Sequence, residues 1–445
     1  MKVIFAVLAG LAVAQAGAVH AAGYGVGQES PSGAGVANAG GAAGAQDAST
    51  VWSNPAGMVR LGTEAVAGAH FLLPQIRYED RGSVLFDGTP VSGGNGGNGA
   101  YAAAIPNLYF VWQQSPGLSF GLGINAPYGL VTDYKPDFVG RYSEVTTNLK
   151  TINFNPSVAV RLGGGWSVGG GVDIGYADAK LLQAVDFGSV CASSAFGAAA
   201  CAAGFNLAPG KNDGAGEFTS TDFGAGFNIG FLYEFSPTTR VGAHYRSKIE
   251  YKFNGDSHFD VPANARAFLV AAGSPAGFTD GGAQTELTIP ETASVSAYHE
   301  LNARWAVMGD VTWTRWNRFD ELRIDADNPQ TPTNLLLTDW HNVFRLAAGA
   351  TYRWSDALTL RGGLAYDESP IPTRNRGPGI PDSDRYVVAT GLGWQATPSA
   401  TIDVGYQHIF FREGPTARVS GTNSVMNGKF ENDVDIVSLG LRWKF

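Results

Sequence analysis

The chain has 445 residues, including 60 glycines, 25 Phe, 16 Tyr and 10 Trp, whereas only 16% of its residues are charged. A formal net charge of -9, without any Lys- or Arg-rich run, excludes nucleic acid as a partner. Beyond the N-terminus the sequence contains no uninterrupted run of about 20 apolar residues, and it therefore predicts no membrane-spanning helix.

Residues 1–21 have the pattern of an export signal. Lys2 supplies a positive start, residues 3–14 form an apolar run, and Val19-His20-Ala21 offers a cleavage site. We therefore predict a signal peptide over residues 1–21 and an exported mature chain that begins near Ala22.

Residues 22–60 are rich in Gly, Ala and Ser, show no strand-like alternation, and end shortly after Asn54-Pro55-Ala56. A disordered leader is one reading of such a composition, but the apolar residues Val51, Trp52 and Met58 favour a packed segment. We predict that residues 22–60 form a compact plug, or hatch.

From Ala65 onward, segments with alternating apolar and polar residues predict β-strands. Short connections, such as residues 115–117 and 163–165, take turns with long ones, such as residues 320–339 and 413–429. This strict alternation predicts an all-β fold for residues 61–445, namely a fourteen-stranded antiparallel transmembrane β-barrel in the bacterial outer membrane. Such a barrel is too wide to be filled by its wall side chains alone, so it either contains a plug or leaks, and we expect residues 22–60 to be that plug.

Cys191 and Cys201 lie in a Gly/Ala/Ser-rich stretch and, in an exported chain, predict a disulfide that closes a loop. None of the seven histidines has the spacing of metal ligands, and no Gly-x-Ser-x-Gly or phosphate-binding loop occurs. The sequence therefore predicts no metal, no cofactor and no enzyme. A lipid hydrolase stays open as an alternative, because serine, histidine and acidic side chains can meet through strand register.

Ala126-Pro127-Tyr128-Gly129 lies in the expected third strand. Proline cannot donate a hydrogen bond to the sheet, so Pro127 indicates either a bulge that opens a gap in the wall or simply the end of the strand. Lys180 and Arg323 lie near the loop-facing strand ends, where each is either a candidate partner for a ligand carboxylate or a solvated, paired charge.

Several motifs together resemble the FadL/TodX family of outer-membrane transporters for long-chain fatty acids and hydrocarbons, and the resemblance covers nearly the whole mature chain. The most specific is Tyr366-Asp367-Glu368-Ser369-Pro370-Ile371-Pro372, followed by Arg376 and by Asp384-Arg385. Asn54-Pro55-Ala56, Ala126-Pro127-Tyr128-Gly129 and the terminal Phe445 support it.

The resemblance implies an N-terminal hatch, capture of a hydrophobic ligand among the loops, and lateral exit into the lipid bilayer through a kink at Ala126-Pro127-Tyr128-Gly129. On this basis we expect passive, ligand-gated diffusion, with long-chain fatty acids as the first expectation and aromatic or alkane hydrocarbons as the alternative. We expect a monomer, since a closed barrel needs no partner. By position, Arg323 matches a basic residue that binds the ligand carboxylate. The second such position departs from the family pattern, because Asp178 occupies one candidate slot and Lys180 the next.

Overall fold

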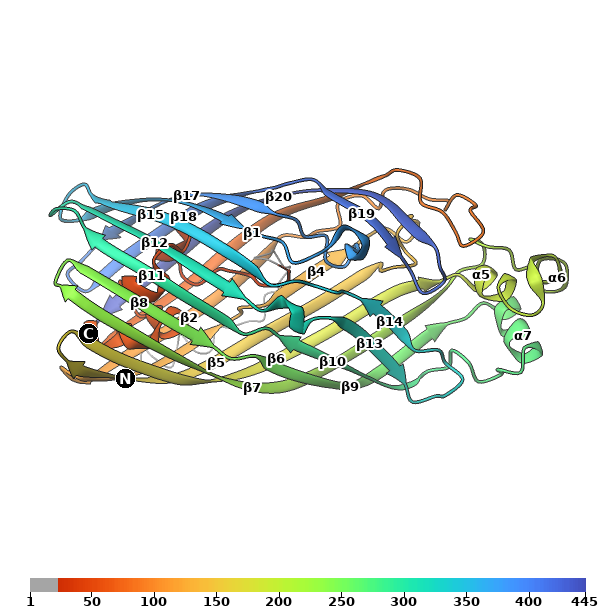
Figure 1. The fold of residues 1–445 in the computed structure, drawn as a ribbon, viewed down its shortest axis with the longest axis horizontal. Helices are drawn as coiled ribbons and strands as arrows, with labels where there is room; N and C mark the ends of the chain where they lie inside the picture. Colours follow the sequence, from red (N-terminus) through yellow and green to blue (C-terminus); the bar gives the residue numbers. More distant parts are fainter. Residues whose placement is uncertain (1–22) are drawn as a thin grey trace.

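The computed structural model describes residues 23–445, and the predicted signal peptide lies outside the described residues. The described residues form a closed antiparallel β-barrel of fourteen strands, which confirms the predicted fold (Figure 1). The barrel closes where the first strand pairs with the last along its whole length, from Glu64 opposite Lys444 to Asp80 opposite Gly428. Short turns lie at one end of the barrel, and long loops lie at the other.

The barrel strands are of two kinds. The uninterrupted strands are β1 (Glu64–Asp80), β2 (Ala103–Ser115), β5 (Thr146–Gly163), β6 (Trp166–Val185), β7 (Gly214–Ser236), β16 (Leu358–Asp367), β17 (Arg385–Gln395) and β20 (Val425–Lys444). The others consist of two pieces each, namely β3 (Leu118–Asn125) with β4 (Gly129–Asp133), β8 (Thr239–Arg246) with β9 (Ile249–Asp260), β10 (Gly281–Ile289) with β11 (Thr292–Glu300), β12 (Trp305–Thr314) with β13 (Glu321–Ala326), β14 (Asn334–Leu337) with β15 (Val343–Arg353), and β18 (Ala400–Phe411) with β19 (Gly414–Val419).

The alternation of side chains explains why these segments form a membrane barrel. On β20, Leu439 and Leu441 are 46% and 45% exposed, whereas Ser438 between its apolar neighbours is fully buried in the interior. Apolar side chains thus face the lipid and polar ones face inward. Exposed tryptophans form a girdle near the turns, made of Trp112, Trp166, Trp305, Trp354, Trp394 and Trp443.

Two of the expected long loops are in fact partly strand. Within residues 320–339, β13 and β14 pair as a hairpin, and within residues 413–429, β19 pairs with β20. The prediction of loops was wrong here. In β13 the alternation is the reverse of that in a lipid-facing strand, because Glu321, Arg323 and Asp325 point outward whereas Leu322 and Ile324 line the interior.

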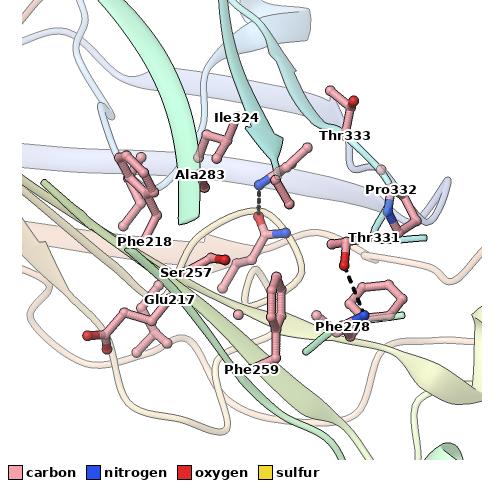
Figure 2. A pocket seen from close by; sticks show the side chains of 18 of the residues that line it. Glu217, Phe218, Ser257, Phe259, Phe278, Ala283, Ile324, Thr331, Pro332 and Thr333 are labelled. Carbon is pink, nitrogen blue, oxygen red and sulfur yellow. Dashed lines mark hydrogen bonds between the residues drawn. The ribbon is translucent and has the colours of Figure 1, made fainter. Parts of the chain in front are cut away.

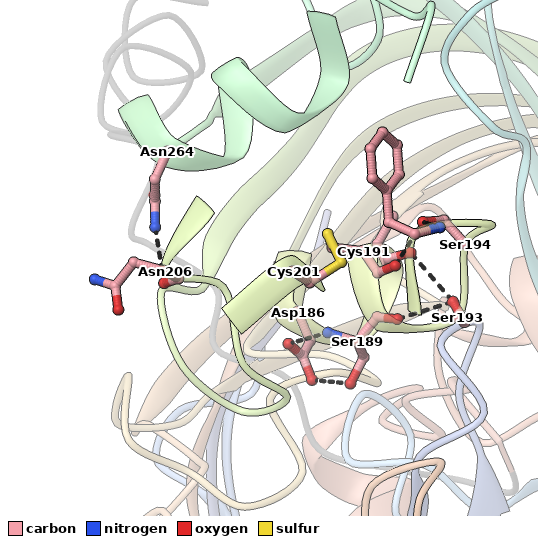
Figure 3. Close-up of a disulfide and its surroundings, with 10 residues drawn as sticks. Asp186, Ser189, Cys191, Ser193, Ser194, Cys201, Asn206 and Asn264 are labelled. Atoms are coloured by element: carbon pink, nitrogen blue, oxygen red, sulfur yellow. Dashed lines mark hydrogen bonds between the residues drawn. A yellow bond between two sulfur atoms is a disulfide. The ribbon is translucent and has the colours of Figure 1, made fainter. Parts of the chain in front are cut away.

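A small helical cap covers part of the loop end of the barrel. It consists of α5 (Phe187–Ala192), α6 (Gly197–Phe205) and α7 (Ala263–Ala271), which share a hydrophobic core. The structure joins Cys191 to Cys201 by a disulfide, with the two Cα atoms 5.9 Å apart, and so ties α5 to α6 (Figure 3). No helix within residues 23–445 is long and apolar enough to cross a membrane.

Residues 23–60, called the N-terminal segment below, run inside the barrel in its turn-side half (Figure 1). Glycines in the wall let this segment approach closely. A Cβ atom on Gly230 would lie 1.9 Å from Asn54 Oδ1, and one on Gly242 would lie 1.8 Å from Ala42 O. The helices of the segment are α2 (Pro31–Ala34), α3 (Gly41–Gly44), α4 (Thr50–Ser53) and η1 (Pro55–Arg60). In the barrel, η2 (Trp316–Arg318) lies in the break between β12 and β13, and η3 (Thr373–Asn375) lies in the loop between β16 and β17.

Candidate functional site: a gap in the wall and the cavities behind it

Asn54-Pro55-Ala56 anchors the N-terminal segment to the wall. The Asn54 side chain accepts a hydrogen bond from Ala56 N at 3.0 Å and caps η1, while Pro55 occupies the first helical turn, where no backbone donor is needed. The Asn54 amide nitrogen donates to Ala42 O and to Phe231 O of β7, at 2.6 and 2.9 Å. One asparagine therefore holds two turns of the segment together and attaches them to the barrel.

The third barrel strand is broken where Pro127 lies. Asn125 of β3 pairs with Asn153, and Gly129 of β4 pairs with Lys150, so three residues of this strand face two residues of β5. This is a β-bulge. On the other side of the strand, pairing between β2 and β3 ends at Leu108 opposite Ile124, and no ladder joins β4 to residues 103–107 of β2 in the described structure. The wall therefore has a lateral gap, bounded by these residues of β2 and by β4.

The N-terminal segment supplies the hydrogen bonds that β2 does not. Val26 N donates to Pro127 O at 2.8 Å, and Gly129 N donates to Tyr24 O at 2.9 Å. Residues 24–26 thus occupy the position of a missing strand behind the lateral gap. Exposed apolar side chains flank the gap on the outside of the barrel, where they belong to the lipid-facing belt: Phe71, Leu73, Ile152 and Phe154.

Tyr24 fills an aromatic cluster in the lumen. Its ring lies 4.7 Å from that of Trp316, 5.6 Å from that of Phe319 and 5.8 Å from that of Trp340, measured between centroids. Its hydroxyl donates to Thr288 O at 3.0 Å. The side chain is only 1% exposed and belongs to a continuous apolar cluster that also contains Phe218 and Ala283.

An outer pocket of about 210 Å³ lies at the loop end of this cluster (Figure 2). Phe218, Phe259 and Ile324 surround it, and Asn334 Nδ2 donates to Gln183 Oε1 at 3.1 Å across it. Phe218 also belongs to the apolar cluster around Tyr24, so the floor of the outer pocket and the lumen cluster share apolar side chains. None of the described residues that line it is Lys or Arg.

Lys180 and Arg323 do not line the outer pocket. Arg323 lies between Leu322 and Ile324, which line the pocket, so strand alternation directs it to the opposite face, where its Nε contacts Asp325 at 2.7 Å. Lys180 lies between Ala179 and Leu181, which face the lumen, so strand alternation directs it outward. Its ammonium pairs at 2.9 Å with Glu217, which lines the outer pocket. The expectation that these two cations meet a ligand in the lumen therefore has no support from their orientation.

An inner cavity of about 180 Å³ lies between the N-terminal segment and the wall, and Pro127 and Tyr128 line it. Arg246 lines it as well, and also lines a much smaller cavity of about 10 Å³ directly behind Pro127 and Tyr128. Arg246 forms an ion pair with Asp173, and its Nη2 donates to Trp52 O at 2.8 Å. A guanidinium thus links the wall, the N-terminal segment and the lateral gap.

A serine–histidine contact exists, but it is sealed. His70 Nδ1 lies 2.7 Å from Ser438 Oγ, and Asn107 Nδ2 lies 2.7 Å from His70 Nε2. His70 and Ser438 are both fully buried, and the nearby wall glycine Gly440 packs against Pro31 of the N-terminal segment. His70, Asn107 and Ser438 therefore lie in the packed interior and not at the rim of the barrel. Within residues 23–445 no group of three His, Cys, Asp or Glu side chains is arranged to hold a metal.

Sequence reasoning missed Tyr24 and Arg246. Tyr24 stands alone in a Gly-rich stretch, and a single aromatic residue there is a weak signal. Arg246 ends β8 and precedes the break at residues 247–248, so the sequence marks it only as the end of a strand. Strand interruptions next to charged residues would have been the feature to search for.

Comparison with known proteins gives consistent matches over nearly the whole chain. Residues 12–445 match the family model described as outer membrane protein transport protein (OMPP1/FadL/TodX). The chain is 30% identical to a putative outer membrane protein of Neisseria meningitidis serogroup B, over 97% of this chain and 96% of that protein. It is 32% identical to a long-chain fatty acid transport protein of Escherichia coli O6:H1, over 89% and 90% of the two chains.

Solved structures share the fold. The crystal structure of a Pseudomonas aeruginosa FadL homologue superimposes with a TM-score of 0.87 at 24% identity, over 95% of this chain and 100% of that one. The Pseudomonas putida toluene transporter TodX superimposes with a TM-score of 0.66 at 15% identity, over 94% and 98% of the chains.

Proposed function

Because the chain belongs to the family of outer membrane transport proteins that includes OMPP1, FadL and TodX, we propose that it takes up long-chain fatty acids by passive, ligand-gated diffusion. Membership in this family places it in the bacterial outer membrane. The choice of fatty acids is supported by relatives that are named for that transport. In this proposal the protein works as a monomer, since a closed barrel has no free edge, and it performs no catalysis.

The observation that carries the proposal is the lateral gap between β2 and β4, with residues 24–26 hydrogen-bonded into it. A permanent hole in a barrel wall would leave backbone groups unsatisfied against lipid, at a cost of several kcal/mol for each group. Here the N-terminal segment satisfies Pro127 O and Gly129 N. The same contacts can be released, so the arrangement fits a gate.

The route follows the apolar cluster. A ligand enters the outer pocket, displaces Tyr24 from its aromatic neighbours, and leaves sideways through the gate formed by Ala126, Pro127, Tyr128 and Gly129. Lateral exit spares the apolar chain a passage through the aqueous periplasmic mouth. Asn54-Pro55-Ala56 keeps the rest of the N-terminal segment attached as a hatch while residues 24–26 move.

The energetics require such a gate. Burial of about ten methylene groups at about 0.8 kcal/mol each stabilises a bound chain by roughly 8 kcal/mol, equivalent to about micromolar affinity before the costs of binding. A ligand held that tightly leaves quickly only if the protein changes conformation. A ligand that occupies the position of the Tyr24 ring would displace it, and ligand binding would thereby be coupled to opening of the gate.

Uptake of uncharged aromatic or alkane hydrocarbons is the second candidate. The outer pocket favours this candidate. None of its described lining residues is Lys or Arg, and an uncharged ligand needs no cationic partner. A pocket of this kind captures an apolar molecule without discriminating a carboxylate.

Equilibrium binding of oleate and of toluene to detergent-refolded protein distinguishes the two candidates. We expect micromolar binding of oleate and release of the bound ligand into lipid vesicles when the protein is reconstituted. Binding of toluene without oleate would replace fatty acid uptake by hydrocarbon uptake. Binding of neither ligand would refute the transport proposal.

A further inference from the structure

The inner cavity contains buried polar atoms that no described residue satisfies. His244 Nε2, Trp316 Nε1 and Asn125 Oδ1 have no hydrogen-bond partner in the described structure, and all three residues line this cavity. These residues are 8%, 2% and 4% exposed, so bulk water does not reach them directly. Buried polar groups are normally paired, and a polar cavity of this size holds water or the polar part of a ligand.

Arg246 stands at the edge of this cavity nearest the lateral gap. It is the only Arg or Lys among the described residues that line both the inner cavity and the small cavity behind Pro127 and Tyr128. The small cavity is otherwise largely apolar, with Ile152, Ile249 and Ile289 in its lining. A charged group therefore lies where the polar inner cavity adjoins a small and largely apolar cavity of about 10 Å³ next to the lateral gap.

The contacts of Arg246 can be exchanged. Its partner Asp173 also accepts hydrogen bonds from Asn153 Nδ2 at 2.9 Å and from Asn228 Nδ2 at 3.0 Å, so this carboxylate does not depend on the guanidinium alone. The other contact of Arg246 is a neutral carbonyl, Trp52 O, with the guanidinium carbon 3.4 Å from the Trp52 ring centroid. A carboxylate is a stronger acceptor for guanidinium than a carbonyl, because the bond is assisted by charge on both sides.

We propose that Arg246 binds the carboxylate of an acidic apolar ligand at the lateral gap and that, by exchanging Trp52 O for this carboxylate, it loosens the N-terminal segment. The inference rests on the proposed uptake function and assigns its specificity for a charged head group to Arg246, where the inner cavity adjoins the small cavity at the gap, rather than to the outer pocket or to the remainder of the inner cavity. The outer pocket then selects for apolarity, and Arg246 selects for charge. Trp316 Nε1 provides a further donor in the same cavity.

The test compares ligands that differ in the head group. Oleate and oleyl alcohol share one alkyl chain, and only oleate carries a charge. We expect Arg246→Gln, and the charge-balanced pair Arg246→Gln with Asp173→Asn, to weaken oleate binding at least about tenfold, about 1.4 kcal/mol, and to change oleyl alcohol binding by less than about twofold. The pair keeps the test valid if the single variant leaves Asp173 unpaired and fails to fold.

Arg345 provides a matched control. It also lines the inner cavity, contacts the carbonyl of Ala37 in the N-terminal segment and pairs with an acidic residue, Asp310, but it does not line the small cavity at the gap. Arg345→Gln with Asp310→Asn makes the same charge change, and we expect it to leave the ratio of oleate to oleyl alcohol affinity unchanged.

Loosening of the N-terminal segment, which stays attached at Asn54-Pro55-Ala56, is measured separately as hydrogen exchange of residues 24–60. Oleate, but not oleyl alcohol, should accelerate exchange in the wild-type protein, and the Arg246 variants should exchange fast without ligand. Unchanged oleate affinity in the Arg246 variants would overturn the inference while leaving fatty acid uptake intact. Failure of the wild-type protein to bind either ligand would instead refute the proposed function.

Discussion

Two parts of the barrel wall show how the same kind of strand can seal or open. At the closure of the barrel, β1 pairs with β20 without interruption along all 17 residues of β1. Two strands further along, the strand made of β3 and β4 has one extra residue opposite β5, and its β4 part has no ladder with β2. Closure requires only a regular ladder, whereas a lateral gap requires a bulge and a replacement for the missing hydrogen bonds.

The largest effect on uptake is expected from a change that makes the lateral gap resemble the regular β1–β20 pairing. Deletion of Pro127 would restore equal residue numbers between Asn125–Gly129 and the facing residues of β5, so β4 could pair with β2 as β1 pairs with β20. We expect uptake of oleate into lipid vesicles to fall to the level of vesicles without protein, because the gap closes.

Binding at the outer pocket supplies the control for this deletion, since that pocket lies at the loop end of the barrel and should retain its affinity. Insertion of one alanine after Gly121, in β3, would change the register without removing the proline and serves as the matched variant. Normal uptake after the Pro127 deletion would show that the gap is not the exit.

Tyr24 gives the next largest effect, because it holds the replacement strand in place. Tyr24→Ala removes the ring from the contacts with Trp316 and Trp340, and truncation of a buried aromatic side chain typically costs about 3–5 kcal/mol. We expect faster hydrogen exchange of residues 24–26 and faster oleate uptake.

Tyr24→Phe is the control for the ring, because it removes only the hydrogen bond to Thr288 O, which is worth about 1 kcal/mol. Equal exchange rates in the Ala and Phe variants would mean that the aromatic contacts do not secure the segment.

A smaller effect concerns pH and Glu29 of the N-terminal segment. Burial raises the pKa of the Glu29 carboxyl from 4.5 to about 7, and Asp310 acts in the same direction against the opposing effect of Arg345. The seated segment thus favours the protonated carboxyl, whose stabilising contribution is full below pH 4.5 and is lost as the pH rises through about 7.

Hydrogen exchange of residues 24–60 should therefore accelerate between pH 5 and pH 8 beyond the intrinsic change of exchange chemistry. Glu29→Gln, which cannot ionise, should abolish this additional acceleration. If the pH dependence of hydrogen exchange were identical in the wild-type protein and in the Glu29→Gln variant, ionisation of Glu29 would be excluded as the cause of the acceleration.

The smallest effect on stability and binding is expected in the helical cap, which lies at the loop end, away from the lateral gap. Replacement of Cys191 and Cys201 by serine removes a crosslink over a short loop, so it should loosen α5 and α6 locally and leave the barrel melting temperature unchanged. Outer-pocket affinity should fall a few-fold at most, because Val190 of α5 lines that pocket. A lower melting temperature of the whole barrel would show that the cap contributes to wall stability.

Alternating lengths of turns and loops were enough to predict the strand number, since each wall strand must cross the same apolar belt. The bulge at Pro127 was predictable as one of two alternatives, because proline cannot donate to a ladder. The sequence could not decide between them, since that depends on the ending of the β2–β3 ladder at Leu108, a relation between strands.

The orientation of the charged residues was beyond the sequence for a similar reason. Lys180 and Arg323 face away from the lumen. The sequence alone does not fix the strand register, and a register shift of one residue would move each side chain to the other face of the sheet. Arg246 became a candidate only when the structure brought β8, Trp52 and Pro127 around common cavities.

In the proposed route, residues 24–26 must leave the lateral gap before a ligand can pass. Gly25 and Tyr128 face each other in an antiparallel bridge, where paired Cα atoms are close enough for a disulfide. We predict that the Gly25→Cys, Tyr128→Cys double variant blocks oleate uptake when oxidised and regains it on reduction, while each single variant transports under both conditions. Equal uptake by the oxidised and reduced double variant would show that ligand passes without movement of residues 24–26.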